Sequence, residues 1–181
     1  MPLNETVREA AAEAQRTLRK SGANVKWVEG ENLHFTLKFL GDTPVSRVPE
    51  LLAVGREVAN RTAPIQVRVR GLGSFPPQRP PQVIWAGCGE GAEAFAALGR
   101  DLDAALTAAE LAEPDQRSFM PHLTLGRVRG CGNLSELAEC LQQAADLELG
   151  AMVVERFLLI SSELGRGGPT YTTVESFEVR R

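Results

Sequence analysis

Residues 33–39 read LHFTLKF, and residues 122–125 read HLTL. The only two histidines of the chain, His34 and His122, each open the same pattern of histidine, bulky apolar residue, threonine and leucine. Apolar and polar residues alternate in both stretches, which is typical of a half-buried β-strand. The alternation predicts that the apolar side chains of residues 33–39, Phe39 included, face a core. The histidine and threonine of each stretch then share the opposite face.

Two imidazoles and two hydroxyls suit chemistry at a phosphodiester. An imidazole has an ordinary pKa of about 6.5, so near neutrality one ring can be neutral while another is protonated. A neutral ring can take a proton from water, and a charged ring can give one to a leaving oxygen. The hydroxyls of Thr36 and Thr124 can donate to the remaining phosphate oxygens. Positioning and electrostatics then supply most of the acceleration, so that no metal or other cofactor is needed.

Structural, metal-binding and serine-hydrolase roles for the histidines are less well supported. A single histidine on a strand is usually a surface residue or a hydrogen-bonded core residue, but the repeated motif argues against this. Zinc needs three or four ligands, and no cysteine, carboxylate or third histidine stands at ligand spacing near the motifs. There is no G-x-S-x-G motif of a serine hydrolase. The three cysteines form no C-x-x-C pair and predict free thiols in a reducing cytoplasm, not a catalytic thiol: Cys88, Cys131 and Cys140.

The composition predicts a globular protein of one domain or two fused lobes. The chain has 181 residues, of which 43% are hydrophobic and 24% charged. No apolar run approaches the roughly 20 residues that span a bilayer, and the first residues lack the basic and apolar regions of a signal peptide. The net charge is −3 and the pI about 5.5. A site for a small anion or a chain end fits this charge better than a long nucleic-acid groove.

Hydrophobic periodicity and turn residues predict the order of the elements. Helices are expected over 5–20, 47–60, 91–111 and 134–145, with Asn4, Ser46 and a capping box at Asn133 as their starts. Further strands are expected over 25–28, 65–69, 83–87, 153–161 and 171–179. The prolines and glycines of 71–82 predict a stiff loop, either a binding rim or a plain connector. The class is α+β with mostly antiparallel strands, in two similar lobes whose histidine strands face each other across a cleft.

Four blocks of the sequence, in this order, resemble the two-histidine (2H) phosphoesterase superfamily, and within it the LigT-like RNA 2′,3′-cyclic phosphodiesterases. The blocks are VKWVEGENLHFTLKFLGDT (25–43), GLGSFPPQRPPQVIWAGC (71–88), FMPHLTLGRV (119–128) and ISSELGRGGPTYTTV (160–174). The resemblance covers nearly the whole chain. It implies one bilobal domain over 1–181 with a pseudo-two-fold axis, in which two mostly antiparallel sheets line a central cleft and the helices lie outside.

The resemblance also implies an activity. Family members hydrolyse a terminal 2′,3′-cyclic phosphate on RNA and leave a 2′-phosphomonoester, and some join RNA halves by a 2′–5′ linkage. On this pattern His122 is the base that activates water, and His34 is the acid that protonates the departing 3′-oxygen. Thr36 and Thr124 hold the phosphate. The pseudo-symmetry makes the two histidine roles easy to exchange.

Five more residues near the motifs have two interpretations each. Arg127 completes an H-x-T-x-x-R pattern that the family uses near the phosphate. Strict alternation places Arg127 on the face opposite His122, and it reaches the cleft only if the strand ends or bulges near Gly126. Lys38 shares the face of His34, where it either assists the reaction or is a surface lysine. Three aromatic residues either stack on a base or pack in the core: Phe39, Phe75 and Trp85.

The expected partners are RNA ends that carry a 2′,3′-cyclic phosphate, tRNA halves among them. Small cyclic nucleotide phosphates of the ADP-ribose type are the alternative, which the acidic pI favours, and a non-catalytic module that binds RNA ends is another. We expect a monomer in the cytoplasm. The family normally has an apolar strand before the first helix, and this chain begins there with Met1-Pro2-Leu3. Either another segment replaces that strand, or its absence exposes a sheet edge that would favour self-association.

Overall fold

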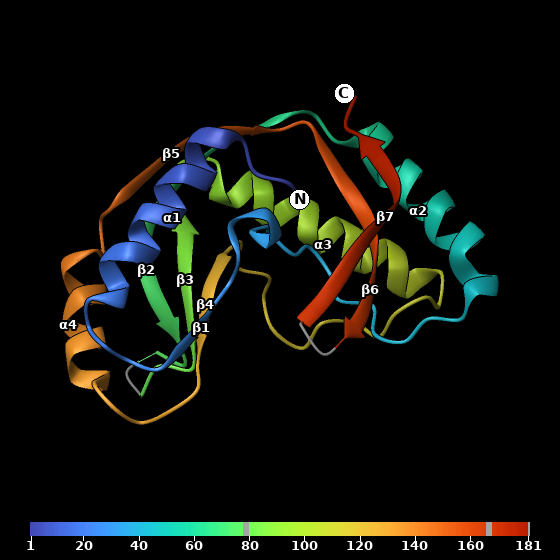
Figure 1. Ribbon diagram of the computed structural model, residues 1–181. Helices are drawn as coiled ribbons and strands as arrows, with labels where there is room; N and C mark the ends of the chain where they lie inside the picture. The colour runs from blue at the N-terminus through green and yellow to red at the C-terminus, as the bar shows by residue number, and fades with distance from the viewer. Residues whose placement is uncertain (78–79, 166–167, 181) are drawn as a thin grey trace.

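The computed structural model describes residues 1–77, 80–165 and 168–180 (Figure 1). The helices are α1 (Glu5–Arg19), α2 (Val48–Arg61), α3 (Ala92–Ala108) and α4 (Leu134–Gln143). The strands are β1 (Val25–Trp27), β2 (Ile65–Phe75), β3 (Val83–Cys88), β4 (Leu123–Val128), β5 (Glu148–Val154), β6 (Arg156–Gly165) and β7 (Gly168–Glu178). Two short 3₁₀ turns, η1 (Gly30–Asn32) and η2 (Val45–Arg47), lie on either side of the first histidine motif in the sequence.

The strands form one large sheet and one hairpin. The large sheet has the spatial order β1-β4-β3-β2-β5, and every neighbouring pair in it is antiparallel. The hairpin consists of β6 and β7 and forms no pairs with the large sheet among the described residues. The α+β class with antiparallel strands is confirmed. The two lobes are less alike than the repeated motif predicts, because one has five strands and the other has two.

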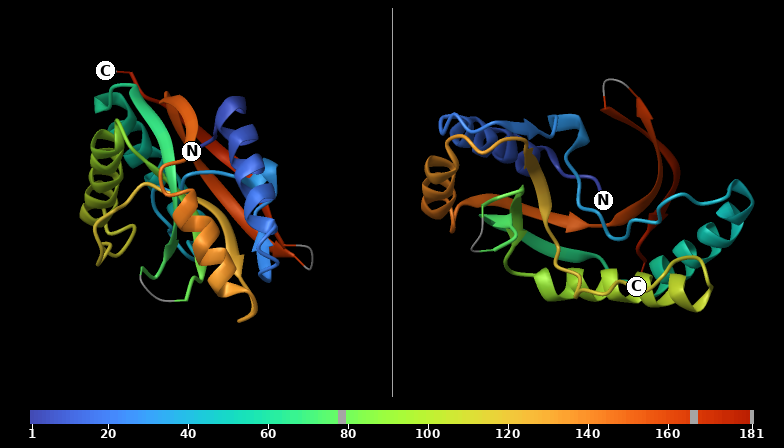
Figure 2. Two further views of the ribbon diagram at one scale, coloured as in Figure 1. Left: turned by 90° about the vertical axis from the view of Figure 1, so that its left-hand side faces the viewer. Right: turned by 90° about the horizontal axis from the view of Figure 1, so that it is seen from below.

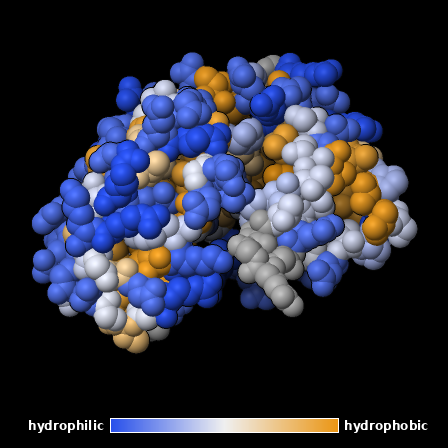
Figure 3. Space-filling view, viewed as in Figure 1, coloured by the Kyte–Doolittle hydropathy of each residue, from blue (hydrophilic) through white to orange (hydrophobic). Residues whose placement is uncertain are grey.

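The helices connect the two lobes in a chain of contacts. Helix α1 packs against β5 and α4, and α4 packs against β2. Helix α3 touches both β2 and α2, and α2 lies against the hairpin. Figure 2 shows α3 extending from the large sheet towards α2, so that one long helix serves both lobes. A hollow opens between the lobes in the space-filling view of Figure 3.

Helix α1 forms as the sequence predicts. The side chain of Asn4 accepts a hydrogen bond of 3.0 Å from the backbone N–H of Val7, which satisfies one of the free donors at the helix start. Four of the five apolar residues that recur at helical spacing are buried, namely Val7, Ala11, Ala14 and Leu18, whereas Ala10 is partly exposed. The apolar stripe therefore covers the large sheet, and the charged residues of α1 face the solvent.

The first histidine motif is buried as predicted at two positions but is not a strand. Leu33 and Phe35 are 2% and 1% exposed, and Phe35 packs edge-on against Phe95 of α3 with ring centroids 5.3 Å apart. Phe35 forms one isolated bridge, and no other residue of 33–39 is assigned to a strand. Phe39 is 81% exposed, so its predicted place in the core is wrong. The alternation is lost because the chain leaves the sheet after Phe35.

The predicted loop over 71–82 is wrong in its first part. Strand β2 continues to Phe75 and pairs with β3 on one side as far as its last residue. The glycines do not end the strand. A Cβ atom on Gly73 would collide with the indole of Trp85, so Gly73 gives the indole room to lie across the strand. The predicted strand over 153–161 is in fact two strands, because β5 ends at Val154 and β6 begins at Arg156.

Two predicted helix caps are also wrong. Helix α2 is preceded by η2, and its N-cap position is Arg47 with no side-chain cap, so Ser46 does not cap it. Asn133 precedes α4 with a backbone φ of 56°, and its side chain makes no capping hydrogen bond. A capping residue normally has an extended backbone, which directs its side chain at the free N–H groups. The left-handed conformation of Asn133 therefore excludes the predicted capping box.

Candidate active site

The two histidine motifs lie side by side. Phe35 pairs with Leu123 in an antiparallel bridge, and both side chains point into the core, 1% and 0% exposed. The backbone of Phe35 also exchanges two hydrogen bonds with the backbone of Met1, of 2.9 and 3.2 Å. The central residues of the two motifs are thus in register although they are far apart in the sequence.

The bridge brings the polar residues of the two motifs to one region of the molecule. His34 and Thr36 flank Phe35, and His122 and Thr124 flank Leu123, so both imidazoles and both hydroxyls belong to residues next to the bridged pair. In extended segments, the residues on either side of a bridged pair point to the opposite surface from it. The bridged side chains point into the core, which leaves the other side to the histidines and threonines.

Both imidazole rings are held in the same way. Nδ1 of His34 lies 2.7 Å from the carbonyl oxygen of Asn32, and Nδ1 of His122 lies 2.8 Å from that of Met120. A carbonyl oxygen can only accept, so Nδ1 of each ring carries a hydrogen. Nε2 is then the free nitrogen of each ring: it accepts a proton when the ring is neutral and donates one when the ring is charged.

An aromatic ring lies edge-on to each histidine. Tyr171 of β7 contacts His34 with centroids 5.5 Å apart and planes at 76°, and Phe75 of β2 contacts His122 at 5.2 Å and 86°. From the sequence, Phe75 was expected only to stack on a base or pack in the core, and Tyr171 had no expected role. One sequence feature common to Phe75 and Tyr171 could have indicated them as site residues. Both lie within two residues of a proline, inside blocks that resemble the family.

Burial changes the pKa of His34. Desolvation lowers this pKa below its ordinary value, the hydrogen bond to the Asn32 carbonyl raises it, and the charge of the Met1 amino group lowers it again. The net effect is a lowered pKa, because a charged imidazole loses more hydration on burial than a neutral one. Near neutral pH, His34 of the free protein is therefore mainly neutral.

The lowered pKa of His34 predicts a loss of stability in acid. Between the folded pKa and the unfolded value of about 6.5, the unfolded chain binds more protons, so the free energy of unfolding falls as the pH drops through this window. Replacing His34 by Gln removes this contribution. In urea unfolding at pH 7.5 and at pH 5, we expect wild type to lose more stability than His34→Gln. Because the Met1 amino group also has a pKa lowered by burial, to about 6, only the difference between the two proteins is informative. Equal losses in both proteins would contradict the assignment.

Arg127 lies on the same face as the motif residues because β4 carries a bulge. Trp85 pairs with Thr124, whereas the preceding residue of β3 pairs with Gly126. Leu125 is therefore an extra residue on β4. After the bulge the alternation resumes in the opposite phase, so that Arg127 shares the face of Thr124. From the sequence, Arg127 reaches the cleft only if β4 bulges near Gly126, and β4 has this bulge.

Lys38 is neither a surface lysine nor directed at the phosphate position. Its side chain is only 5% exposed, and its ammonium group forms ion pairs with Asp103 at 2.5 Å and Asp115 at 2.7 Å. Burial alone would lower the pKa of Lys38, but the hydrogen bonds and charges of the two carboxylates outweigh it and raise the pKa. The surface interpretation is thus wrong for Lys38, because the carboxylates that pair with its ammonium group come from distant parts of the chain. A role of Lys38 in the reaction stays a prediction.

A hollow of about 450 Å³ adjoins the second motif. Its lining includes Trp85 of β3 and the two residues before His122, Met120 and Pro121. The indole of Trp85 packs against Phe75 with centroids 5.3 Å apart, and its N–H has no hydrogen-bond partner among the described residues. The hollow therefore places the aromatic ring of Trp85 near the residues that lead into His122.

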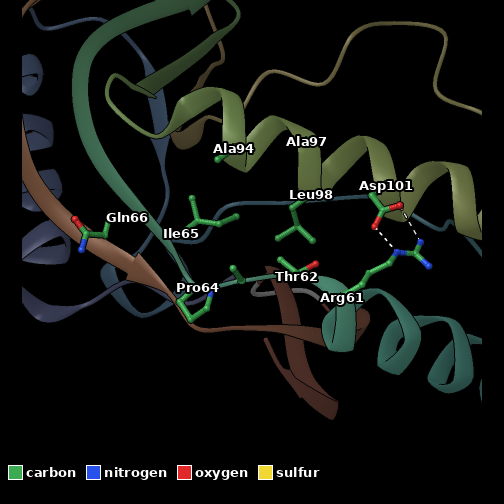
Figure 4. A pocket seen from close by; sticks show the side chains of 10 residues that line it. Arg61, Thr62, Pro64, Ile65, Gln66, Ala94, Ala97, Leu98 and Asp101 are labelled. Atoms are coloured by element: carbon green, nitrogen blue, oxygen red, sulfur yellow. Dashed lines mark hydrogen bonds and ion pairs between the residues drawn. The ribbon is translucent and has the colours of Figure 1, made fainter. Parts of the chain in front are cut away.

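A larger hollow lies elsewhere. It has about 550 Å³ and contains no motif residue, as Figure 4 shows. Its residues come from the end of α2, the start of β2 and one face of α3. The guanidinium group of Arg61 closes one side by pairing with Asp101, with Nε and Oδ2 2.8 Å apart. The size of a hollow therefore does not identify the site here.

Two features are absent from the part of the chain that the structure describes. No group of three or more histidine, cysteine, aspartate or glutamate side chains is placed to hold a metal ion there. No described helix has the length and apolar character needed to cross a membrane. The three cysteines are free thiols, as predicted.

The fold and the paired motifs are those of a phosphoesterase of the two-histidine class. A family model described as "LigT like Phosphoesterase" matches residues 1–85 and 88–171. The chain belongs to this family of LigT-like phosphoesterases. It is similar to the RNA 2′,3′-cyclic phosphodiesterase of Methanothermobacter thermautotrophicus, with 38% identity over 98% of this chain and 95% of the relative. The corresponding enzyme of Thermus thermophilus is 36% identical over 98% of this chain and 87% of its own length.

Solved structures agree with this assignment. A crystal structure of a Thermus thermophilus protein superimposes with a TM-score of 0.81 at 34% identity, covering 98% of this chain and 94% of that one. Escherichia coli LigT in complex with 3′-AMP gives a TM-score of 0.74 at 21% identity, covering 100% of this chain and 95% of that one, which supports the fold. The predicted bilobal LigT-like fold is thereby confirmed.

Proposed function

We propose that this protein hydrolyses the 2′,3′-cyclic phosphate at an RNA end to a 2′-phosphomonoester, without a metal ion. The observation that carries the proposal is the antiparallel bridge between Phe35 and Leu123, which brings the two histidine motifs side by side. The relatives named RNA 2′,3′-cyclic phosphodiesterase, which match over nearly their whole length, support the same reaction.

The two imidazoles perform the proton transfers. Nε2 of neutral His122 takes a proton from a water molecule, and the water oxygen attacks phosphorus. The bond between phosphorus and the 3′-oxygen breaks on the opposite side, and Nε2 of protonated His34 gives its proton to that oxygen. Two imidazoles from neighbouring motifs, one on each side of the phosphorus atom, suit this in-line displacement. A 5′-hydroxyl in place of water would give a 2′–5′ linkage by the same transfers.

The threonines and Arg127 act on the phosphate oxygens that do not leave. The hydroxyls of Thr36 and Thr124 donate hydrogen bonds to these oxygens. Arg127, on the same face as Thr124, adds positive charge. The bound phosphate carries a negative charge, which raises the pKa of His34 and opposes the effect of burial. Substrate binding therefore helps to protonate the general acid.

The nucleoside next to the phosphate lies in the hollow beside His122. Trp85, which packs against Phe75, provides an aromatic surface there for a base. The substrates are RNA ends, tRNA halves among them, because the named relatives act on RNA. The protein acts as a monomer, since one chain supplies both motifs, and in the cytoplasm, where free thiols persist.

The test is product analysis with a short oligonucleotide that ends in a 2′,3′-cyclic phosphate, in buffer with EDTA. We expect quantitative formation of the 2′-phosphate, identified by phosphorus NMR. A 3′-phosphate product or inhibition by EDTA would contradict the mechanism. Tight binding without turnover would instead support a module that binds RNA ends. The same assay with a cyclic mononucleotide separates RNA ends from small cyclic nucleotides, because a preference for the mononucleotide would favour the latter.

A further inference from the structure

Lys38, whose own side chain is buried, is at the centre of a polar cluster that the proposed reaction does not use. The side chain of Asp103 is 22% exposed and that of Asp115 is 47% exposed. Its ammonium group donates to Oδ1 of Asp103 at 2.5 Å, to Oδ1 of Asp115 at 2.7 Å and to the carbonyl oxygen of Glu113 at 2.8 Å. An ammonium group has three N–H donors, and each of them has an acceptor here. The backbone N–H of Asp115 also bonds both carboxylate oxygens of Asp103, at 3.3 Å.

The partners of Lys38 come from three parts of the chain. Lys38 comes directly after the first motif and two positions beyond Thr36. Asp103 lies on α3. Asp115 lies in the loop that leads from α3 to His122. The cluster thus connects the segment that leaves the first motif with the segment that enters the second.

Apart from one backbone bridge, side-chain contacts hold the segments that carry the two motifs. The bridge between Phe35 and Leu123 is the only β-pair that the first motif makes among the described residues. The loop before His122 is held on α3 by a second contact, in which the ring of Phe119 covers Gly99. A Cβ atom on Gly99 would collide with this ring. The position of Thr36 relative to His122 therefore depends on how side chains hold the two segments.

We propose that Lys38 is a positioning residue, whose ammonium group ties the segment carrying His34 and Thr36 to the loop before His122. A direct role on the phosphate is disfavoured because all three N–H donors are in use and the side chain is 5% exposed. Replacing Lys38 leaves the partly buried carboxylate of Asp103 without its cation, so that the loop and the first motif separate. A displacement of about 1 Å at the reacting groups can lower a rate by about 100-fold.

The test compares Lys38→Met, Lys38→Arg and Lys20→Met. Lys20 is an exposed lysine at the end of α1 and serves as the matched control. With the cyclic-phosphate oligonucleotide, we expect Lys38→Met to lower kcat by about 10- to 100-fold with a smaller change in KM. Lys38→Arg keeps the charge and should recover most of this loss, and Lys20→Met should behave as wild type. Should Lys38→Met fail to fold, Asp115→Asn loosens only the loop side of the cluster and should still lower kcat several-fold.

A second measurement does not need turnover. In the free protein, the ring NMR signals of His34 and His122 should shift in Lys38→Met and not in Lys20→Met. An inactive wild type would refute the proposed function on which the kinetic test rests, and the NMR shifts would still test the positioning role. A folded Lys38→Met variant with wild-type kcat would overturn the inference. So would equal losses in Lys38→Met and Lys38→Arg with unmoved histidine signals, because Lys38 would then act on the substrate itself.

Discussion

Replacing either His34 or His122 by alanine is expected to lower kcat for the cyclic-phosphate oligonucleotide by about 100- to 10,000-fold. This is the usual contribution of a positioned acid or base. Each variant lacks one of the two imidazoles to which the proposed mechanism assigns a proton transfer, whereas both threonines, which that mechanism assigns to phosphate binding, stay in place. KM should therefore change less than kcat. The measurement is steady-state turnover, with urea unfolding of each variant to establish that it is folded.

A modified substrate can separate the two roles. When sulfur replaces the 3′-oxygen, the departing thiolate is stable without protonation, so a general acid is no longer needed. With this substrate, His34→Ala should regain most of the lost rate and His122→Ala should not. The pH profile alone cannot make this distinction, because two interacting groups give pKa values that belong to the pair. Recovery of His122→Ala instead would reverse the two roles, and full activity of both variants on the natural substrate would refute the mechanism.

The repeated motif was sufficient to predict that the two histidines converge. Local alternation fixes which side chains point into the core, and this holds for Leu33, Phe35 and Leu123, all 2% exposed or less. The α+β class and the four helices also follow from local periodicity. These features could be predicted because each depends on residues close together in the sequence.

Features that depend on distant contacts could not be predicted. Lys38 is buried only because Asp103 and Asp115, from α3 and the following loop, come to its ammonium group. Strand β2 continues through Gly71 and Gly73 because β3 pairs with it and the indole of Trp85 covers Gly73. Propensity rules score such residues in isolation, and tertiary pairing overrides them.

Arg127 illustrates the limit most clearly. Its sequence position allows it to reach the cleft only with a bulge near Gly126, but no residue in the sequence required such a bulge. The bulge results from the pairing of β4 with β3, where two adjacent residues of β3 pair with residues two apart on β4. The role of Arg127 on the phosphate stays a prediction. The same is true of self-association through an exposed sheet edge.

The pair Phe35→Ala and Phe39→Ala tests where the alternation of the first motif ends. Phe35 is 1% exposed and packs against Phe95, so its truncation should lower the free energy of unfolding by about 3–5 kcal/mol, as large cavities in cores do. Phe39 is 81% exposed, so the same truncation there should change the free energy of unfolding by less than about 0.5 kcal/mol. Urea unfolding with a common slope measures both values.

The two variants are matched controls for each other, since they remove the same atoms from positions of the same predicted face. A continuous strand over 33–39 would bury both rings and give two large losses. A chain that leaves the sheet after Phe35 gives one large loss, because only Phe35 lies between the core and the bridge to Leu123. Equal, large losses would therefore contradict the irregular path of residues 36–39. That path also places Lys38 beside α3, so the same result would remove the geometric basis of its positioning role.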